Sequence, residues 1–111
     1  LLGVAVPDDA HGVLQDIHWS FGELGYFPTY AIGNIVAAQL WTALRRDVAG
    51  LDDQIAAGEY GAIRRWLREH VHRHGRTVEP AQLLERATGE GLDPAPLLEQ
   101  LNLKYRGLYG I

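Results

Sequence analysis

The sequence predicts an all-α protein. Apolar residues recur mainly at three- and four-residue steps, the period of a helix face, and no alternating run bounded by hairpin turns predicts a strand. Glycine and proline divide the chain into segments of helical length. Because 111 residues suffice for one hydrophobic core but not for two, we expect residues 1–111 to form a single helical domain or one helical fragment of a larger protein.

The N-terminal segment is expected to contain a turn and a loop. Asp8 or Asp9 should cap a turn that runs to about Trp19, because a carboxylate accepts the unpaired N–H groups of a first turn. The glycines that follow predict a loop. Pro28 suits the start of a helix, since its ring presets φ and its missing N–H is not needed there.

The main helix is expected from about Pro28 to Val48. Its C-terminal Arg45 and Arg46 suit the negative end of the helix dipole. The apolar run at 31–44 should be a buried helix, because it is interrupted by polar residues and falls short of the ~20 residues that a bilayer span needs. Gly33 costs about 1 kcal/mol relative to Ala in mid-helix, which predicts that a backbone or a ligand comes close to it.

Four shorter helices are expected to follow, each with its own start or stop signals. They are Leu51 to Ala57, capped by Asp52 or a neighbour and closed by Gly58; Tyr60 to His74, with Gly75 in the left-handed C-terminal position; a helix that begins at Thr77 or Glu79 with Pro80 in its first turn; and a last helix with Asp93 as N-cap and Pro94 at N1. In the last one, Leu97, Leu98, Leu101 and Tyr105 form an apolar stripe.

Composition argues against two classes of partner or site. Ten Lys and Arg are spread among fourteen Asp and Glu, for a net charge of -4, whereas phosphate binding needs clustered basic residues, so we expect no nucleic-acid partner. No Cys occurs, which rules out disulfides and thiolate metal sites and favours a reducing compartment, so the expected location is cytoplasmic. His70 and His74 share a helix face, but no carboxylate is spaced to complete a metal site with them.

Residues 12–39 are predicted to be the wall of a binding site. They place polar and aromatic side chains, among them Gln15, Asp16, His18 and Trp19, beside glycines that let a ligand approach the backbone. The alternative is a buried hydrogen-bonded network that fastens the loop to the following helix. Composition leaves both interpretations open.

Several motifs, in this order, resemble the thermostable carboxypeptidase family, the HExxH-type zinc enzymes also known as the Taq carboxypeptidase family. They are GxxQDxHW at 12–19, GxxGYFPTY at 22–30, GNxxAAQ at 33–39, WLREHVHRHGR at 66–76, LLERATGEGLDP at 83–94 and KYRGLY at 104–109. The resemblance covers nearly the whole chain. It implies the helical C-terminal portion of a larger, mostly helical, zincin-like metallopeptidase whose chain is several times longer.

The resemblance also implies an activity, the hydrolysis of C-terminal residues from peptides. Such enzymes bind zinc through two His at i and i+4 of a helix, with an intervening Glu as general base. No HExxH occurs in these 111 residues. We therefore expect zinc or another divalent metal to be held by upstream residues of the same enzyme, and the fragment alone to be inactive. The resemblance further implies a homodimer for the intact enzyme.

Within that resemblance, residues 12–39 would line the substrate cleft and residues 51–111 would support it. Asp16 would orient the imidazole of His18, which would donate a hydrogen bond to a substrate or a tetrahedral oxyanion. Gln15, Asp16 and Trp19 are expected to be supporting residues. The alternative from another functional class is a free-standing helical binding or structural module with no catalysis.

Tyr26 and Tyr30 are the further site candidates. They lie four residues apart, one helical turn, so their hydroxyls can point the same way. Phenol groups can bind a C-terminal carboxylate or an oxyanion without adding charge. The alternative is that both are core aromatic residues whose hydroxyls contact water, which is common for tyrosine. Tyr30 is the stronger candidate of the two, because it opens the helix that should line the cleft.

Overall fold

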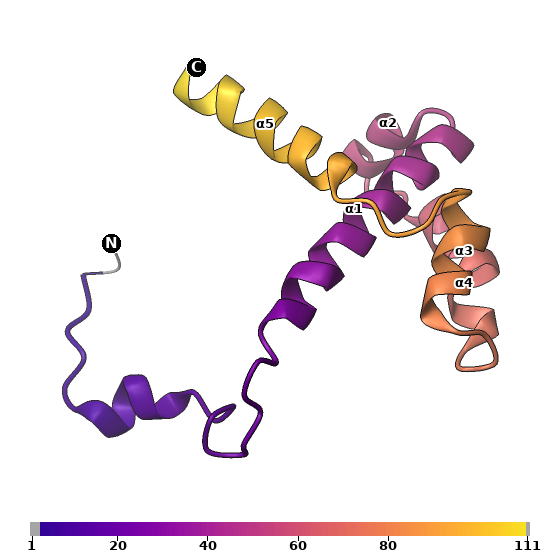
Figure 1. Ribbon diagram of the computed structural model, residues 1–111. Coiled ribbons are helices and arrows are strands. Elements are labelled where there is room, and N and C mark those ends of the chain that lie inside the picture. Colours follow the sequence, from indigo (N-terminus) through magenta and orange to yellow (C-terminus); the bar gives the residue numbers. More distant parts are fainter. Residues whose placement is uncertain (1–2, 111) are drawn as a thin grey trace. The chain divides into compact units, whose positions relative to one another are not determined.

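A computed structural model of the chain describes residues 3–110 (Figure 1). It contains the α-helices α1 (Pro28–Asp47), α2 (Leu51–Ala56), α3 (Gly61–His70), α4 (Pro80–Thr88) and α5 (Ala95–Tyr109), and the 3-10 helices η1 (Asp9–His11), η2 (Val13–Gln15) and η3 (His72–His74). No strand occurs within the described range, and the predicted all-α class is confirmed. The chain divides after Ala31 into two compact units, which are described separately.

The first unit, which ends at Ala31, begins with two short helices and a loop. Asp8 caps η1 as predicted, since its carboxylate accepts the His11 N–H at 2.9 Å. The expected single turn up to Trp19 is instead η1 and η2, joined at Gly12, followed by hydrogen-bonded turns. Gly12 is required there, because a Cβ would lie 2.6 Å from Val6 Cγ1. The predicted loop after Trp19 is confirmed.

Helix α1 matches its predicted bounds but not its predicted burial. Its later residues Ala38 and Leu44 are each only 3% exposed, whereas Ile32 is 46% exposed. The expectation of a buried helix over 31–44 is therefore wrong for the first half, where the described chain leaves the side chains uncovered. A Cβ at Gly33 would meet nothing within 4 Å. The predicted close approach of another backbone is therefore not found among the described residues. None of the described helices is long and apolar enough to cross a membrane.

The core lies in the second unit, where α1 meets α2, α3 and α4. Its buried members are Ala43, Leu44, Leu51, Trp66 and Ala87, and partly buried aliphatic and aromatic side chains pack around them. Helices α3 and α4 lie side by side in this unit (Figure 1). Burial of apolar surface in this cluster is the main source of stability for the unit.

Helix α2 begins differently from the prediction. Gly50, with φ 64°, is its N-cap and no side chain caps it, so the prediction of a cap at Asp52 is wrong. Asp52 is engaged elsewhere, because its carboxylate accepts a hydrogen bond from the Arg45 guanidinium at 3.0 Å. The predicted closure at Gly58 is confirmed by its left-handed φ of 75°.

Helix α3 is shorter than predicted. It ends at His70 instead of His74, and η3 replaces the last turn. The side chains of both histidines bind carbonyls of the preceding turn, with His70 Nδ1 2.9 Å from the Trp66 oxygen and His74 Nε2 3.1 Å from the Glu69 oxygen. The His74 contact satisfies the Glu69 carbonyl, which a longer helix would have paired with a backbone N–H group.

The last two helices begin close to their predicted starts. Glu79 is the N-cap of α4, with Pro80 at its first residue, and Gly89 closes that helix at φ 91°. The N-cap of α5 is Pro94 and not the predicted Asp93, so the helix begins one residue later than expected, although the Asp93 carboxylate still accepts the Ala95 N–H at 2.9 Å. The predicted apolar stripe of α5 contains no buried residue; Leu98, for example, is 56% exposed. Of its four residues only Leu97 is partly buried, and the other three are exposed.

Candidate functional site

The residues with the clearest chemistry lie in the first unit and are referred to as the His18 cluster: Asp16, His18, Tyr26, Phe27 and Tyr30. His18 is its centre. Its Nδ1 lies 2.7 Å from Asp16 Oδ1, and its Nε2 lies 2.9 Å from the hydroxyl of Tyr30. The same Asp16 oxygen accepts the backbone N–H of His18 at 2.9 Å. The structure therefore brings three of the predicted site residues into one hydrogen-bonded chain.

Asp16 fixes the protonation pattern of the His18 ring. Both hydrogen bonds from His18, first the backbone one and then the side-chain one, hold the pKa of the Asp16 carboxyl below its ordinary value. An ionised carboxylate only accepts hydrogen bonds, so Nδ1 of His18 carries a hydrogen. Nε2 of the neutral ring is then an acceptor, and the Tyr30 hydroxyl donates to it. This assignment follows from the hydrogen-bond geometry.

Aromatic rings surround the imidazole of His18. Tyr26 stacks on it at a centroid distance of 5.6 Å, and Phe27 lies at 4.9 Å with its plane tilted by 45°. Tyr30 meets it edge-on, at 81° and 6.0 Å. The rings of Tyr26 and Tyr30 also touch each other edge to face, at 5.5 Å, so the two predicted tyrosines are neighbours.

The cluster is open to solvent in the described chain. The His18 side chain is 24% exposed and that of Asp16 49%, and Tyr26 and Tyr30 are 42% and 52% exposed as residues. A network that only fastened a loop into a core would have its polar tips covered. Here each of these four residues keeps part of its surface accessible to a ligand.

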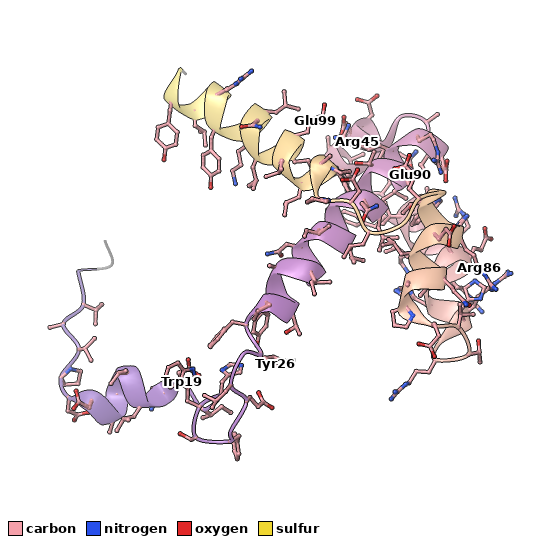
Figure 2. The ribbon with its side chains drawn as sticks, viewed as in Figure 1. Trp19, Tyr26, Arg45, Arg86, Glu90 and Glu99 are labelled. Carbon is pink, nitrogen blue, oxygen red and sulfur yellow. The ribbon has the colours of Figure 1, made fainter. Side chains whose placement is uncertain are left out.

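Two predicted supporting residues do not touch His18. Gln15 donates through Nε2 to the carbonyl of Ala10, which ties η2 to η1. Trp19 is 70% exposed and lies on the turns before the loop, whereas Tyr26 lies at the end of the loop, just before α1 (Figure 2). Of the predicted supports, only Asp16 contacts the imidazole.

The described residues do not fit a metal ion. Across residues 3–110, no three His, Cys, Asp or Glu side chains are grouped closely enough to hold one. His70 is instead stacked on Trp66 at a centroid distance of 4.5 Å. His74 binds a backbone carbonyl.

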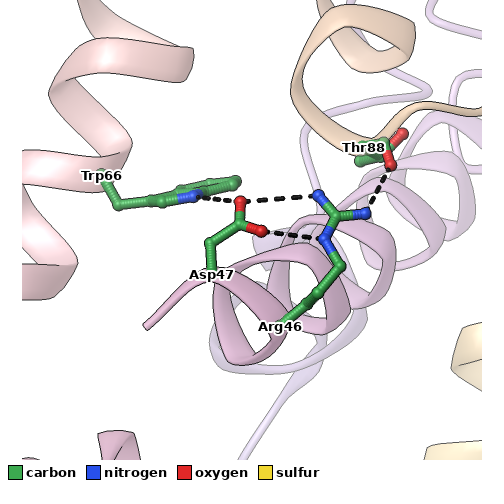
Figure 3. Close-up of polar contacts among 4 residues, drawn as sticks. All are labelled: Arg46, Asp47, Trp66 and Thr88. Carbon is green, nitrogen blue, oxygen red and sulfur yellow. Dashed lines mark hydrogen bonds and ion pairs between the residues drawn. The ribbon is translucent and has the colours of Figure 1, made fainter. Parts of the chain in front are cut away.

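Sequence reasoning missed a second polar group, referred to as the Asp47 network: Arg46, Asp47, Trp66 and Thr88 (Figure 3). The Asp47 carboxylate accepts from Arg46 Nε at 2.8 Å and from the indole N–H of Trp66 at 2.9 Å. Arg46 also donates to the Thr88 carbonyl at 3.1 Å. The sequence indicated only a solvated helix end, because nothing in it shows that Trp66 from α3 would lie opposite Asp47.

The electrostatics of the Asp47 network follow from these contacts. Hydrogen bonds from Arg46 and then Trp66 lower the pKa of the Asp47 carboxyl, and the carboxylate in turn raises the pKa of Arg46. The network joins the end of α1 to α3 and α4. Its donors and acceptors face one another, which indicates a structural role.

Gln39 was also missed. It is 3% exposed, donates to the Gly91 carbonyl at 2.7 Å and accepts the Asp93 N–H at 3.1 Å. One side chain thus satisfies two backbone groups of the connection between α4 and α5. The signal was available, since a Gln within an apolar run must find partners if that run is buried.

Comparisons with known proteins agree with the motif resemblance. The family described as "Carboxypeptidase Taq (M32) metallopeptidase" matches residues 1–105. The chain is 43% identical over 108 residues to Carboxypeptidase 1 of Bacillus subtilis (strain 168), which covers 97% of this chain and 22% of that protein. It is 42% identical over 109 residues to Thermostable carboxypeptidase 1 of Thermus thermophilus, covering 98% of this chain and 21% of that one.

Solved structures give the same result. The M32 carboxypeptidase from Deinococcus radiodurans R1 matches with a TM-score of 0.82 and 44% identity, over 99% of this chain and 22% of that one. Trypanosoma cruzi metallocarboxypeptidase 1 matches with a TM-score of 0.79 and 42% identity, over 95% and 22%. The chain spans about a fifth of the length of the curated relatives that it matches. Because the family match covers nearly every residue, the chain belongs to the M32, or carboxypeptidase Taq, family of metallopeptidases.

Proposed function

We propose that this chain is the C-terminal part of a metallocarboxypeptidase, in which residues 12–39 form one wall of the substrate cleft and residues 51–111 support that wall. The observation that carries the proposal is the Asp16, His18 and Tyr30 relay. It combines an ordered imidazole with a half-exposed phenol, in a chain of this family. The substrate would be a peptide with a free C-terminus.

In this proposal the relay presents hydrogen-bonding groups to the peptide. Asp16 holds the imidazole of His18 in one orientation, and His18 holds the hydroxyl of Tyr30. A carboxylate or a tetrahedral oxyanion that enters the cleft would accept the Tyr30 O–H, which turns to it from His18 Nε2. A hydroxyl already held in position loses little freedom on binding it. The divalent metal, which we propose to be zinc, and its ligands belong to the remainder of the enzyme.

Two substitutions in the intact enzyme test the relay. By intact enzyme we mean the full-length carboxypeptidase that contains these residues. Tyr30→Phe removes the donor hydroxyl and His18→Ala removes the imidazole that holds it in position, and we expect kcat to fall about a hundredfold in each. The rate is measured on a short peptide with purified enzyme. An unchanged rate with a lowered melting temperature would show that the relay serves packing only.

His11 provides a matched control. Its Nδ1 also lies against a carboxylate, 2.6 Å from Asp8 Oδ1, and Asp8 also accepts its backbone N–H. It has no hydroxyl on its other ring nitrogen comparable to Tyr30. His11→Ala therefore removes the same kind of Asp–His pair and should leave kcat unchanged.

The proposal also predicts that the 111 residues alone are inactive. They contain no HExxH, and residues 3–110 have no group of side chains fit for a metal. Purified chain, assayed with and without added zinc, should show no peptide hydrolysis. Turnover by a metal-free preparation would contradict this prediction.

The exposed apolar surface favours this proposal over a free-standing module. Large apolar side chains are left uncovered on both units, among them Phe21 at 74%, Leu103 at 69% and Tyr109 at 71%. Monomeric proteins rarely expose so much large apolar surface. Sedimentation of the isolated chain should show self-association, whereas a free-standing module would sediment as a monomer or as one defined dimer. We further propose that the intact enzyme is a homodimer.

A further inference from the structure

Phe27 contacts both partners of the central hydrogen bond in the His18 cluster. Its ring centroid lies 4.9 Å from that of His18 and 6.1 Å from that of Tyr30. Its side chain has no donor or acceptor, so it takes no part in any proton transfer. Whatever Phe27 contributes to the cluster, it contributes by packing.

The backbone places Phe27 independently of the ring contacts. Pro28 follows it and disfavours a helical conformation at Phe27, so α1 begins just after it. The Phe27 carbonyl accepts the Tyr30 N–H at 3.0 Å, and the Tyr26 carbonyl accepts the Thr29 N–H at 3.0 Å. Phe27 is therefore held by the same first turn that carries Tyr30.

The ring of Phe27 restricts the motion of the His18 imidazole. Asp16 anchors Nδ1, but a ring held at one atom still rotates about that contact and can carry Nε2 away from Tyr30. Tyr26 stacks nearly parallel to the imidazole, at 28°, and Phe27 packs against it at a larger tilt. Such aromatic contacts contribute geometric preference beyond the area that they bury.

We propose that Phe27 is a positioning residue, whose ring keeps His18 Nε2 directed at the hydroxyl of Tyr30. This inference rests on the proposed function of the relay. It assigns to Phe27 an effect on turnover although the residue bears no polar group. Phe27 is 45% exposed, so its packing is not explained by burial in a core.

The test compares the two phenylalanines of the chain in the intact enzyme. Phe27→Leu keeps an apolar side chain but removes the flat ring, and we expect kcat to fall about tenfold with little change in KM, because orientation and not binding is lost. Phe21→Leu is the matched control. Phe21 is 74% exposed in the same unit and has no ring contact with His18, so its variant should keep the parent rate.

Two further measurements separate positioning from general stability. Phe27→Tyr retains the ring and should restore the rate lost in Phe27→Leu. Nitrogen-15 NMR of the His18 ring should show the hydrogen on Nδ1 in every variant, because Asp16 is unchanged. The Nε2 shift should be that of a nitrogen that accepts a hydrogen bond in the parent enzyme and in Phe27→Tyr, and should move toward that of an unbonded acceptor in Phe27→Leu. Where Phe27→Leu does not fold, Phe27→Met is the substitute, since Met fills space without a flat face.

The outcomes distinguish this inference from the proposed function. Equal rates for Phe27→Leu and Phe21→Leu, or an unchanged His18 Nε2 shift in Phe27→Leu, would overturn the role of Phe27 and leave the relay standing. A Phe27→Tyr variant as slow as Phe27→Leu would also overturn it, because the ring is then not the determinant. Failure of the relay itself is seen separately, as parent-like turnover in His18→Ala.

Discussion

The His18 cluster and the Asp47 network are both built on an aspartate that accepts hydrogen bonds, but they end differently. Asp47 accepts from Arg46 and from the Trp66 indole, and Arg46 continues to a backbone carbonyl. In that network both carboxylate oxygens of Asp47 and the Arg46 guanidinium are bonded to other parts of the chain. The chain of bonds from Asp16 instead ends at the hydroxyl of Tyr30, a residue that is 52% exposed.

Because of this difference, we treat the Asp47 network as structural and the His18 cluster as the proposed site. The Asp47 network joins segments 19 and more residues apart around a buried indole, so its loss should lower the free energy of unfolding. The His18 cluster lies within 15 residues of sequence and buries little, so its loss should affect ligand contact more than stability. Substitutions in the two regions should thus have opposite profiles in rate and stability.

The largest effect on stability is expected at Trp66, which is 5% exposed in the core. Trp66→Ala leaves a cavity and an unpaired acceptor, and should lower the unfolding free energy of the intact enzyme by about 3–5 kcal/mol. Trp66→Phe keeps most of the packing and removes the indole N–H, so its loss should be clearly smaller. Denaturant unfolding measures both. A Trp66→Ala enzyme as stable as the parent would contradict the assignment of the core.

Gln39 should give the next largest loss of stability. Gln39→Leu leaves the Gly91 carbonyl and the Asp93 N–H without their partner, which should cost about 1–3 kcal/mol. Gln54→Leu is the control, because Gln54 makes one hydrogen bond, to the Ala49 carbonyl, at an exposed position. Its loss should stay below about 1 kcal/mol. Equal losses at both positions would show that the two buried hydrogen bonds of Gln39 contribute no more to stability than the one exposed hydrogen bond of Gln54.

The two aspartates should then differ in which property they change. Asp47→Asn keeps an acceptor for Trp66 but loses the charge opposite Arg46, so we expect a stability loss of about 1 kcal/mol and an unchanged kcat. Asp16→Asn allows the amide to donate as well as accept, so it no longer fixes the tautomer of His18. It should lower kcat about tenfold or more with little change in stability. Similar profiles for the two variants would remove the distinction between the networks.

The sequence predicted the helices more fully than the contacts between them. The helix starts at Pro28 and Pro80 follow from backbone restriction, which is local, and so does the loop after Trp19. The pairing of His18 with Asp16 was also predictable from the sequence, because the two lie two residues apart. In contrast, the indole of Trp66 opposite Asp47 depends on how α3 packs on α1, which no local pattern encodes.

Burial was predicted less well for a related reason. Apolar periodicity marks the face of a helix that needs a partner, but not where that partner lies. The stripe on α5 and the first half of α1 have such faces, and the described residues leave them exposed. The chain spans about a fifth of the length of its relatives, and under the proposed function the rest of the enzyme covers these faces.

The smallest effect is expected from the titration of Asp16. Hydrogen bonds from His18 hold its folded pKa below the ordinary value of 3.8, so the contact favours the ionised carboxyl. A depressed pKa contributes stability that is fully present above pH 3.8 and is lost as the pH falls through the folded pKa. In His18→Ala, the Asp16 carboxyl should therefore titrate at a higher pH than in the parent, as followed by carbon-13 NMR, while the Asp47 titration stays in place. An unchanged Asp16 titration would mean that the two residues do not interact in solution. Asp16 would then not orient the His18 ring toward Tyr30.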